Sequence, residues 1–408
     1  MCVRLLKFIL FMRQVTRKSP ADIRWIERQG LLAVKLAQIF ALRPDIISLE
    51  KCKQLQTLYS SASTIPTEDV FRILKEKAPD SYHETITWFD VEPLAAASIG
   101  QVHRARLRSG EDVVVKIIKE NHEKKFKRDV RRMSRWLKIA MLISPKLRKV
   151  GNPIALLEHV EDYTLRELDL RNEINGASRL NAIKEDLSND FPMPRLRFPK
   201  YYSELSNRHV LVSELVNGQT LEQGIENSNL EWDDLLELFR IHGAYMFGIG
   251  TFHGDLHPGN CILDPDGNFV FIDNGAICEA PRKVSKSLFN FFYHLSSDDK
   301  DRAFESLVSL AERRPRSDDL EKFKEDMHVI YRDFENLSVG QQSLTEVMMK
   351  TVRSAVENAG ADYGEEGFPI IRSLMYMDGL VIRTHPEVKL ISEMRASLDE
   401  FKSGLDLE

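Results

Sequence analysis

Residues 252 to 276, which read FHGDLHPGNCILDPDGNFVFIDNGA, constrain the fold of this 408-residue chain more than any other stretch. The apolar runs NCILD and NFVFID flank a Pro-Asp-Gly turn, so we expect two short strands joined by a hairpin. Asp255 and Asn260 are five residues apart in a His-Gly-Asp…Pro-Gly-Asn turn, and Asp273 follows the strand FVFI. One carboxylate at a strand end is usually a turn residue or a helix cap. Several polar residues at fixed spacing indicate a site.

Composition and charge exclude some classes of protein. Hydrophobic residues make up 43% of the chain, which is enough for a sizeable core. The net charge of -5 argues against nucleic-acid binding as the main function. The longest apolar runs fall short of the ~20 residues that a membrane-spanning helix requires, so we expect no transmembrane helix. The cysteines lie far apart, without metal-ligand spacing, which favours a reducing cytoplasm: Cys2, Cys52, Cys261 and Cys278.

Hydrophobic periodicity predicts an α+β chain with two lobes. We expect helices over residues 1–85, including one long helix from 21 to 43, and then a β-rich segment. The predicted strands are 86–94, 99–107, 112–118, 198–205 and 208–216, with helices at 121–143 and 156–183 inserted among them. After residue 217 the chain is almost entirely helical apart from the hairpin. The predicted domains are therefore a helical extension (1–85), an N-lobe (86–217) and a C-lobe (218–408).

Lys116 lies in the middle of the apolar strand VVVKII. An ammonium is costly to bury unless it is paired or faces a ligand, although an edge-strand lysine facing water is an equally good reading. Downstream, Asp169 and Glu173 are four residues apart, and like charges at that spacing destabilise a helix unless a cation lies between them. Lys116 is a candidate for that cation. A solvated acidic face, with Arg166 and Arg171 nearby, is the alternative.

Asp255, Asn260 and Asp273 carry the oxygen ligands that suit Mg²⁺, which takes the rest of its shell from water and substrate phosphates. One carboxylate then remains to act as a base. A strand lysine, a helix glutamate, an H-x-D-x-x-x-x-N loop and an Asp-x-Gly after a strand are the parts of a protein kinase, in this order. Lys116 and Glu173 complete that set. The sequence therefore predicts a two-lobed, protein-kinase-like fold that binds Mg²⁺ with ATP or ADP.

One kinase element is missing from the sequence, because no G-x-G-x-x-G precedes the lysine. The loop between the first two predicted strands instead carries AAAS. Alanine lacks the access of glycine to positive φ, so we expect this loop to be stiffer over the phosphates. Its residues are predicted to contact the nucleotide: Ala95, Ala96, Ala97 and Ser98.

With these motifs, residues 21 to 282 closely resemble the UbiB/AarF family of atypical protein-kinase-like proteins, which is associated with ubiquinone biosynthesis. The AAAS loop looks like the family's alanine-rich nucleotide loop, and Glu167 with Asp169 looks like its E-x-D motif. Lys35 to Gln38 resembles its K-x-G-Q motif. The resemblance implies that the N-terminal helices place K-x-G-Q against E-x-D where a peptide would otherwise bind. It implies nucleotide binding and ATP hydrolysis linked to a lipid, and not ordinary protein phosphorylation.

The spacing of the acidic residues supports this arrangement independently. Glu167 and Asp169 are two residues apart and would face different directions on a regular helix, so they could not both pair with Lys116. Lys35 would give Glu167 a partner. By resemblance, the backbone from Glu214 to Val216 would contact the adenine.

The expected roles of the remaining residues follow the phosphoryl-transfer template. Lys116 should hold the α- and β-phosphates and Glu173 should hold Lys116. Asp273 and Asn260 should bind Mg²⁺, and Asp255 should orient or deprotonate the attacking water or hydroxyl.

Two substitutions depart from the family pattern. Ala37 replaces the glycine of K-x-G-Q, which restricts how closely that helix approaches the cleft. Asn274 replaces the phenylalanine of Asp-Phe-Gly, so the apolar contact that senses active geometry is absent. Metal binding by Asp273 does not depend on that phenylalanine, whereas switching between active and inactive states does.

A basic segment between Lys119 and Lys149 contains twelve Lys or Arg and three acidic residues, with an apolar stripe at helical spacing: Phe126, Val130, Met133 and Leu137. Such a helix can lie on anionic lipid, but a solvated face packed on a core is more common. We expect a cytoplasmic protein that is peripheral on the inner face of a membrane. The expected partners are nucleotide, an anionic membrane or isoprenoid lipid, and proteins of quinone biosynthesis.

Two other functions fit the motifs. A small-molecule phosphotransferase of the aminoglycoside or choline kinase type also carries HGDLHPGN followed by ID-x-G, although Lys35, Gln38 and the E-x-D motif argue against it. A lipid-binding scaffold gated by nucleotide, with little turnover, is compatible with Ala37 and Asn274. The predicted function is a UbiB-type ATPase.

Overall fold

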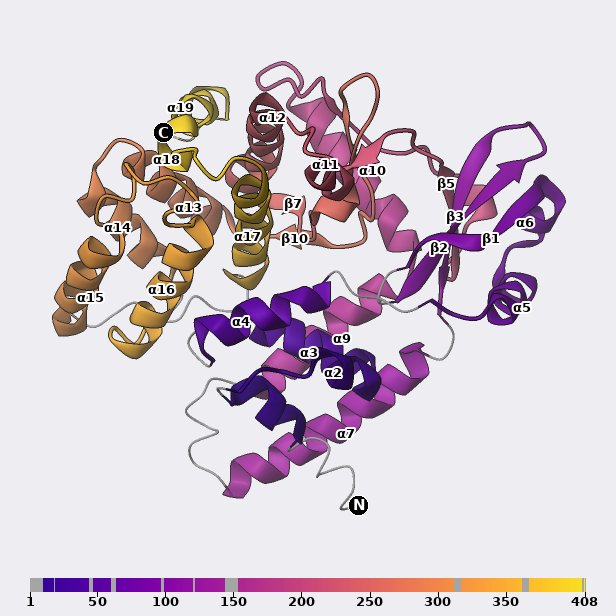
Figure 1. Ribbon diagram of the computed structural model, residues 1–408, viewed down its shortest axis with the longest axis horizontal. Coiled ribbons are helices and arrows are strands. Elements are labelled where there is room, and N and C mark those ends of the chain that lie inside the picture. The colour runs from indigo at the N-terminus through magenta and orange to yellow at the C-terminus, as the bar shows by residue number, and fades with distance from the viewer. Residues whose placement is uncertain are drawn as a thin grey trace. The chain divides into compact units, whose positions relative to one another are not determined.

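The structure is a computed structural model that describes residues 10–17, 19–43, 47–59, 64–96, 99–119, 122–143, 153–311, 317–361, 367–405 and 407 (Figure 1). The chain forms two compact units. The first comprises residues 1–175 and 199–215, and the second residues 176–198 and 216–408. These two units are defined by contacts within the chain. The predicted division into a helical extension, an N-lobe and a C-lobe rests on motifs and stays a prediction.

A four-stranded antiparallel sheet forms the centre of the first unit. Its strands are β1 (Ile86–Ala96), β2 (Gly100–Leu107), β3 (Asp112–Ile118) and β5 (Val210–Glu214), in the order β1-β2-β3-β5. Side chains of a strand alternate between faces, so Val113, Val115 and Ile117 share one face and Lys116 lies on the other. The valine face packs on α5 (Thr67–Lys77) and α6 (Asp80–Thr85), which lie beside the sheet (Figure 1).

The strand predicted at 198–205 is wrong. This stretch contains a 3-10 turn, η2 (Ser203–Leu205), and joins the sheet only through an isolated bridge between Tyr201 and Ser213. Pro199 lacks the backbone N–H that a strand residue donates, and the 3-10 turn reverses the chain before a ladder can form.

Two predicted long helices are each divided in two. The helix predicted from 21 to 43 consists of α2 (Ile23–Gln29) and α3 (Leu31–Phe40), separated by Gly30 at φ 102°. Glycine adopts positive φ without a steric cost, which ends the first helix there. The helix predicted from 156 to 183 consists of α9 (Pro153–Glu167) and α10 (Arg171–Asp186). Leu168 and Leu170, both buried, interrupt it.

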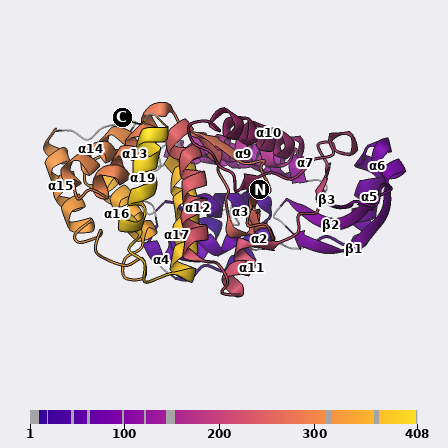
Figure 2. The ribbon, with the colours of Figure 1, turned by 90° about the horizontal axis from the view of Figure 1, so that it is seen from above.

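The first unit also contains α4 (Leu49–Gln56), the 3-10 turn η1 (Thr57–Tyr59) and α7 (His122–Ile143). Helix α7 packs against α3 and α9, which lie close to it in Figures 1 and 2. Phe126 and Val130 of the predicted apolar stripe are buried, with 2% and 3% of their surface exposed. These two residues therefore form part of the interior and are not available to lipid.

The second unit contains the predicted hairpin, which is confirmed. Strands β8 (Cys261–Leu263) and β9 (Phe269–Phe271) are antiparallel and lie between β6 (Gln219–Thr220) and β4 (Leu196–Arg197), in the order β4-β9-β8-β6. A second pair joins β7 (Thr251–His253) to β10 (Ile277–Glu279). These strands frame the loop that holds Asp255 and Asn260 and the loop that holds Asp273.

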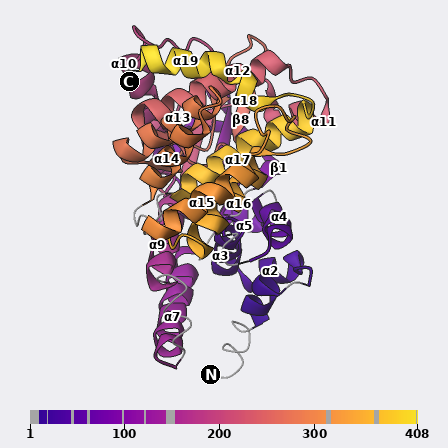
Figure 3. The same cartoon turned by 90° about the vertical axis from the view of Figure 1, so that its left-hand side faces the viewer.

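Helices make up the rest of the second unit and surround one large core (Figure 3). Phe247 lies at its centre and contacts Phe289, Phe292 and Phe401. In the residues that the structure covers, no helix is both long enough and apolar enough to cross a bilayer. The elements are α11 (Leu221–Glu226), α12 (Trp232–Gly243), the π-helix η3 (Ala244–Ile249), the 3-10 turn η4 (Pro258–Asn260), α13 (Arg282–Leu295), α14 (Lys300–Leu310), α15 (Ser317–Ile330), α16 (Leu344–Glu357), α17 (Gly367–Thr384), α18 (Leu390–Glu393) and α19 (Arg395–Gly404).

Candidate functional site

Lys116 and Glu173 form a buried ion pair in the first unit. Lys116 Nζ donates to Glu173 Oε1, and the two residues are only 8% and 6% exposed. The sheet fixes the lysine between Val102 and Leu211, and the glutamate lies in the first turn of α10. The reading of Lys116 as a lysine facing water is wrong. Burying two charges costs free energy that their attraction barely offsets, so such a pair is weak evidence for a stabilising role.

Asp169 does not share Lys116 with Glu173, so that interpretation is wrong. Its carboxylate accepts from Arg171, with Oδ1 2.9 Å from Nε and Oδ2 2.6 Å from Nη2. Hydrogen bonds from Arg171 lower the pKa of the Asp169 carboxyl. The break between α9 and α10 lets Asp169 reach a neighbour two residues away, which an unbroken helix would not allow.

Glu167 is paired with Lys35, as the spacing argument predicted. Lys35 Nζ lies 2.8 Å from Oε1 and 2.6 Å from Oε2, and its ammonium is 5.4 Å from the centre of the Tyr163 ring. The lysine comes from α3 and the glutamate is the last residue of α9. The predicted K-x-x-Q and E-x-D motifs are therefore in contact through Lys35 and Glu167, while Asp169 does not take part.

Gln38 bonds within the N-terminal helices, because its Nε2 donates to the Leu58 carbonyl oxygen at 2.9 Å. Ala37, which replaces the family glycine, is fully buried in α3. A methyl group at this position therefore fills space within the first unit.

The nucleotide-contacting residues predicted at the first loop are only partly covered. Ala95 and Ala96 end β1 and pair with Val102 and Gln101 of β2. Ala97 and Ser98 lie outside the described residues. The structure thus places two of the four alanine-loop residues at the edge of the sheet.

The predicted adenine contact follows β5. The Glu214 N–H donates to the Lys200 carbonyl oxygen at 2.8 Å, and the Leu215 N–H donates to that of Asp112 at 3.4 Å. Within the described part of the chain, the Val216 N–H has no such partner, which makes it the backbone donor of this stretch best suited to a base.

In the second unit, hydrogen bonds fix the loop from His253 to Asn260. The Asp255 N–H donates to His253 Nδ1 at 3.2 Å, and Asn260 Nδ2 donates to the Asp255 carbonyl oxygen at 2.9 Å. Burial lowers the pKa of the His253 imidazole, so the ring is neutral. Because Nδ1 accepts, the proton resides on Nε2, which lies 3.1 Å from the Ile272 carbonyl oxygen. The ring therefore ties this loop to the residue before Asp273.

Asn260 and Asp273 lie on adjoining segments, because the Ile272 N–H donates to the Asn260 carbonyl oxygen at 3.0 Å. Asp273 has φ 56°, an uncommon conformation for a residue other than glycine. Since Asn260 Nδ2 is used by the loop, Oδ1 is the atom of this amide suited to a cation. No cluster of three or more His, Cys, Asp or Glu side chains suited to a metal occurs among the described residues. One carboxylate and one amide oxygen fit Mg²⁺, which completes its shell with water and phosphate.

Asn274 has a structural role in place of the family phenylalanine. It is fully buried, and its Nδ2 donates to the Phe271 carbonyl oxygen at 2.8 Å. A polar bond to the end of β9 thus replaces an apolar contact, which fixes the loop after Asp273.

A residue that the sequence analysis missed contacts the centre of this site. Tyr376 of α17 donates its hydroxyl proton to Asp255 Oδ1 at 2.9 Å. The tyrosine is 121 residues from the aspartate and belongs to no motif. Residues 283–408 showed helical periodicity alone, so no signal in the sequence could have found this contact.

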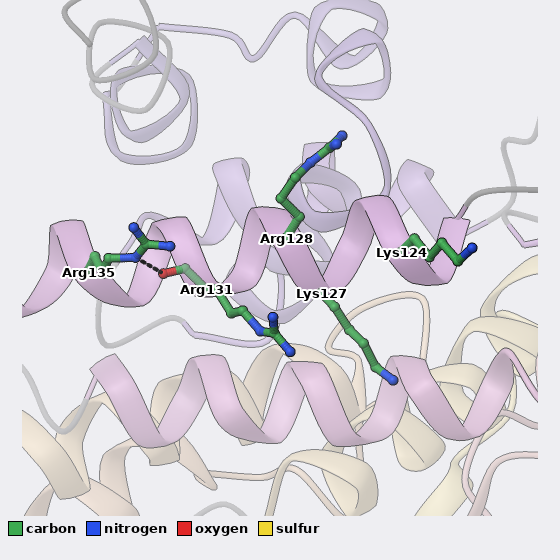
Figure 4. A pocket seen from close by; sticks show the side chains of 5 residues that line it. All are labelled: Lys124, Lys127, Arg128, Arg131 and Arg135. Atoms are coloured by element: carbon green, nitrogen blue, oxygen red, sulfur yellow. Dashed lines mark hydrogen bonds between the residues drawn. The ribbon is translucent and has the colours of Figure 1, made fainter.

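Helix α7 carries a basic surface, which comprises Lys124, Lys127, Arg128, Arg131 and Arg135 and lines a hollow of about 310 Å³. Figure 4 shows Lys127 and Arg131 pointing to one side of the helix and Arg128 to the other. Lys127 is paired with Glu123 at 2.7 Å. The other four are exposed and have no carboxylate partner among the described residues.

A lysine–glutamate pair on a small sheet and an Asp-x-x-x-x-Asn loop beside an Asp-x-Gly turn are the parts of a kinase-like protein. The profile described as the ABC1 atypical kinase-like domain matches residues 57–307. The chain belongs to the family of ABC1 atypical kinase-like proteins, which confirms the resemblance to UbiB/AarF proteins.

Known proteins agree with this assignment. The chain is 23% identical to an uncharacterized chloroplastic aarF domain-containing protein kinase of Arabidopsis thaliana, over 93% of this chain and 74% of that protein. It is 29% identical to the probable protein kinase UbiB of Cellvibrio japonicus, over 64% of this chain but only 46% of that protein. It thus spans about half the length of that relative.

A solved structure shows the same fold. The structure of Rv3197 from Mycobacterium tuberculosis, described as a complex with erythromycin, has a TM-score of 0.55 and 18% sequence identity. The match covers 94% of this chain and 96% of Rv3197. The predicted α+β, kinase-like fold class is therefore confirmed.

Proposed function

We propose that this protein is an atypical kinase-like ATPase that binds Mg-ATP or Mg-ADP and transfers the γ-phosphate to water. The observation that carries the proposal is the buried pair of Lys116 and Glu173, two residues 57 apart that the fold brings together at a considerable cost in desolvation. A buried ion pair that costs desolvation energy and adds little to folding stability is expected at a site that binds phosphates.

The proposed roles follow the chemistry of each group. Lys116 would hold the α- and β-phosphates while Glu173 orients it. Asp273 and Asn260 Oδ1 would hold Mg²⁺, which supplies neutralisation of the phosphate charge. Asp255 would accept the proton of the attacking water. The Val216 N–H would contact the base.

We further propose that ATP hydrolysis supports isoprenoid-lipid or ubiquinone metabolism at a membrane. The support is membership of a family that includes a protein named UbiB, together with the basic surface on α7. Four exposed cations without a carboxylate partner would be attracted to anionic headgroups, at a benefit of about 1 kcal/mol each. Because Phe126 and Val130 are buried, this contact would be electrostatic and sensitive to salt.

Two other candidates lead to different products. A small-molecule phosphotransferase would leave the phosphate on an alcohol, and the pairing of Lys35 with Glu167 argues against it. A nucleotide-gated scaffold would bind nucleotide and release no phosphate, a behaviour that the substitution at Asn274 favours.

The test of the metal assignment is thermal melting with Mg-ATP. At 100 times its Kd, a ligand adds about 2.7 kcal/mol to stability. Asp273→Asn should abolish the rise in melting temperature, because it removes the only negatively charged ligand assigned to Mg²⁺. Asparagine tolerates the left-handed conformation at residue 273, so the variant should fold. The Asp255→Asn variant is the control and should retain the rise. Equal rises for wild type and Asp273→Asn would contradict the assignment.

A further inference from the structure

We propose that Tyr376 is an internal pseudosubstrate, whose hydroxyl occupies the position on Asp255 that an attacking water or alcohol must take. The inference rests on the proposed role of Asp255 as the base. A general base must lie within about 2.6–3.2 Å of the hydroxyl that it deprotonates. The Tyr376 hydroxyl lies 2.9 Å from Asp255 Oδ1, within that range, and donates to it as an acceptor molecule would.

Asp255 does not need Tyr376 to hold its position. Its backbone is fixed on both sides, by His253 Nδ1 and by Asn260 Nδ2. The His257 N–H adds a third bond, to the Asp255 carbonyl oxygen at 2.7 Å. Among the described residues, Tyr376 is the one hydrogen-bond partner of the Asp255 carboxylate. The contact therefore occupies Oδ1 of the carboxylate proposed as the base, while other bonds maintain the loop geometry.

Helix α17 is anchored so that the tyrosine stays in place. Residues 373, 376 and 383 are spaced by three and seven, so they share one face of the helix. Ser373 hydrogen-bonds to His242 Nε2 on one side of the tyrosine, and Arg383 pairs with Glu222 on the other at 2.9 and 2.6 Å. Burial lowers the pKa of His242 to about 3, so it is neutral at physiological pH.

The ring of Tyr376 is also held. It meets the His257 ring edge to face, with centroids 5.4 Å apart and planes at 89°. Tyr376→Phe therefore keeps the ring and its contact and removes only the hydroxyl. This helix lies beyond residues 57–307, which the family profile covers.

The experiment compares steady-state ATP hydrolysis by the full chain with Mg²⁺ in wild type and Tyr376→Phe. A hydrogen bond to a charged group contributes on the order of 1.5–3 kcal/mol, so its removal should raise kcat by about tenfold or more. Arg383→Met, which releases one anchor of α17, should give a smaller rise. Tyr293→Phe is the matched control, because it removes a phenol that accepts from Arg395 at 3.3 Å, away from Asp255.

Each variant is also titrated with Mg-ADP, which separates this inference from the proposed function. Unchanged Mg-ADP affinity with faster turnover in Tyr376→Phe supports the pseudosubstrate. Unchanged or lower turnover in that variant overturns it, and a loss would mean that the hydroxyl positions Asp255 instead. Phosphate found on Tyr376 by mass spectrometry would also overturn it, because the residue would then be an acceptor. Absence of nucleotide binding in wild type would refute the proposed function itself.

Discussion

Single residues decide whether the buried pair of Lys116 and Glu173 contributes to stability or to binding. Removing one member of such a pair typically costs about 3–5 kcal/mol, whereas replacing both with apolar groups is often neutral. We expect Glu173→Gln to lower the free energy of unfolding of the first unit by about 3 kcal/mol. Adding Lys116→Met removes the unpaired buried ammonium and should restore part of the loss, while nucleotide binding should be lost because the phosphates lose their lysine. Urea unfolding of Glu173→Gln, of Lys116→Met and of the double variant measures these free energies.

The exposed pair of Glu111 and Lys200, 3.2 Å apart, is the control for that cycle. Solvent screens both groups, so Glu111→Gln should change stability little. If the losses from the two buried substitutions simply added, Lys116 and Glu173 would not be coupled, and the reading of the pair as a phosphate-binding device would lose its support.

Residue chemistry was predictable where motifs supplied it. The order of Lys116, Glu173, Asp255 and Asp273 predicted a kinase-like set. The resemblance of Lys35 to Gln38 to the K-x-G-Q motif predicted the partner of Glu167, and the spacing of the E-x-D motif supported it. The sequence does not predict the pairing of Asp169 with Arg171, because this pairing depends on the break between α9 and α10. Tyr376 left no trace in the sequence, since a contact across 121 residues depends on how helices pack and not on local pattern.

At the scale of elements, α10 approaches the loop after β9 closely enough to require glycine. A Cβ at Gly176 would lie 1.9 Å from the Asn274 carbonyl oxygen and 2.9 Å from Ile277 Cγ1. Alanine in a helix is ordinarily better than glycine by up to about 1 kcal/mol. We nevertheless expect Gly176→Ala to lose about 1–3 kcal/mol, because a displaced backbone costs more. The rise in melting temperature with Mg-ATP should also shrink, since Asp273 adjoins the displaced residue.

Gly379 of α17 supplies the matched control, because no atom lies within 4 Å of the position of its Cβ. Gly379→Ala should stabilise the protein slightly. Equal gains in melting temperature for Gly176→Ala and Gly379→Ala would contradict this prediction. They would show that α10 and the loop after β9 can move apart without loss of stability.

Element boundaries were less predictable than element types. The hairpin of β8 and β9 and the three strands before α7 follow alternating or turn-bounded patterns, which the sequence carries plainly. The division at Gly30 was hidden because the apolar period continues across it, although its positive φ ends α2. The stretch from 198 to 205 has strand-like composition, but Pro199 and a 3-10 turn prevent a ladder.

At the scale of the whole molecule, the family profile covers residues 57–307, while Lys35 and Tyr376 lie outside it. Both contact residues of the candidate site, one through Glu167 and the other through Asp255. The segments before and after the profile therefore supply contacts that the family core alone does not determine.

The proposed ATPase releases γ-phosphate to water in a reaction that depends on Asp255. The most direct measurement follows labelled γ-phosphate from ATP with the full chain, Mg²⁺ and either neutral or anionic vesicles, with Asp255→Asn as the control. We predict release of inorganic phosphate that rises with anionic vesicles and falls by at least about 100-fold in the variant. Label on a small molecule added as extract, or tight nucleotide binding with no release by any form, would contradict the account.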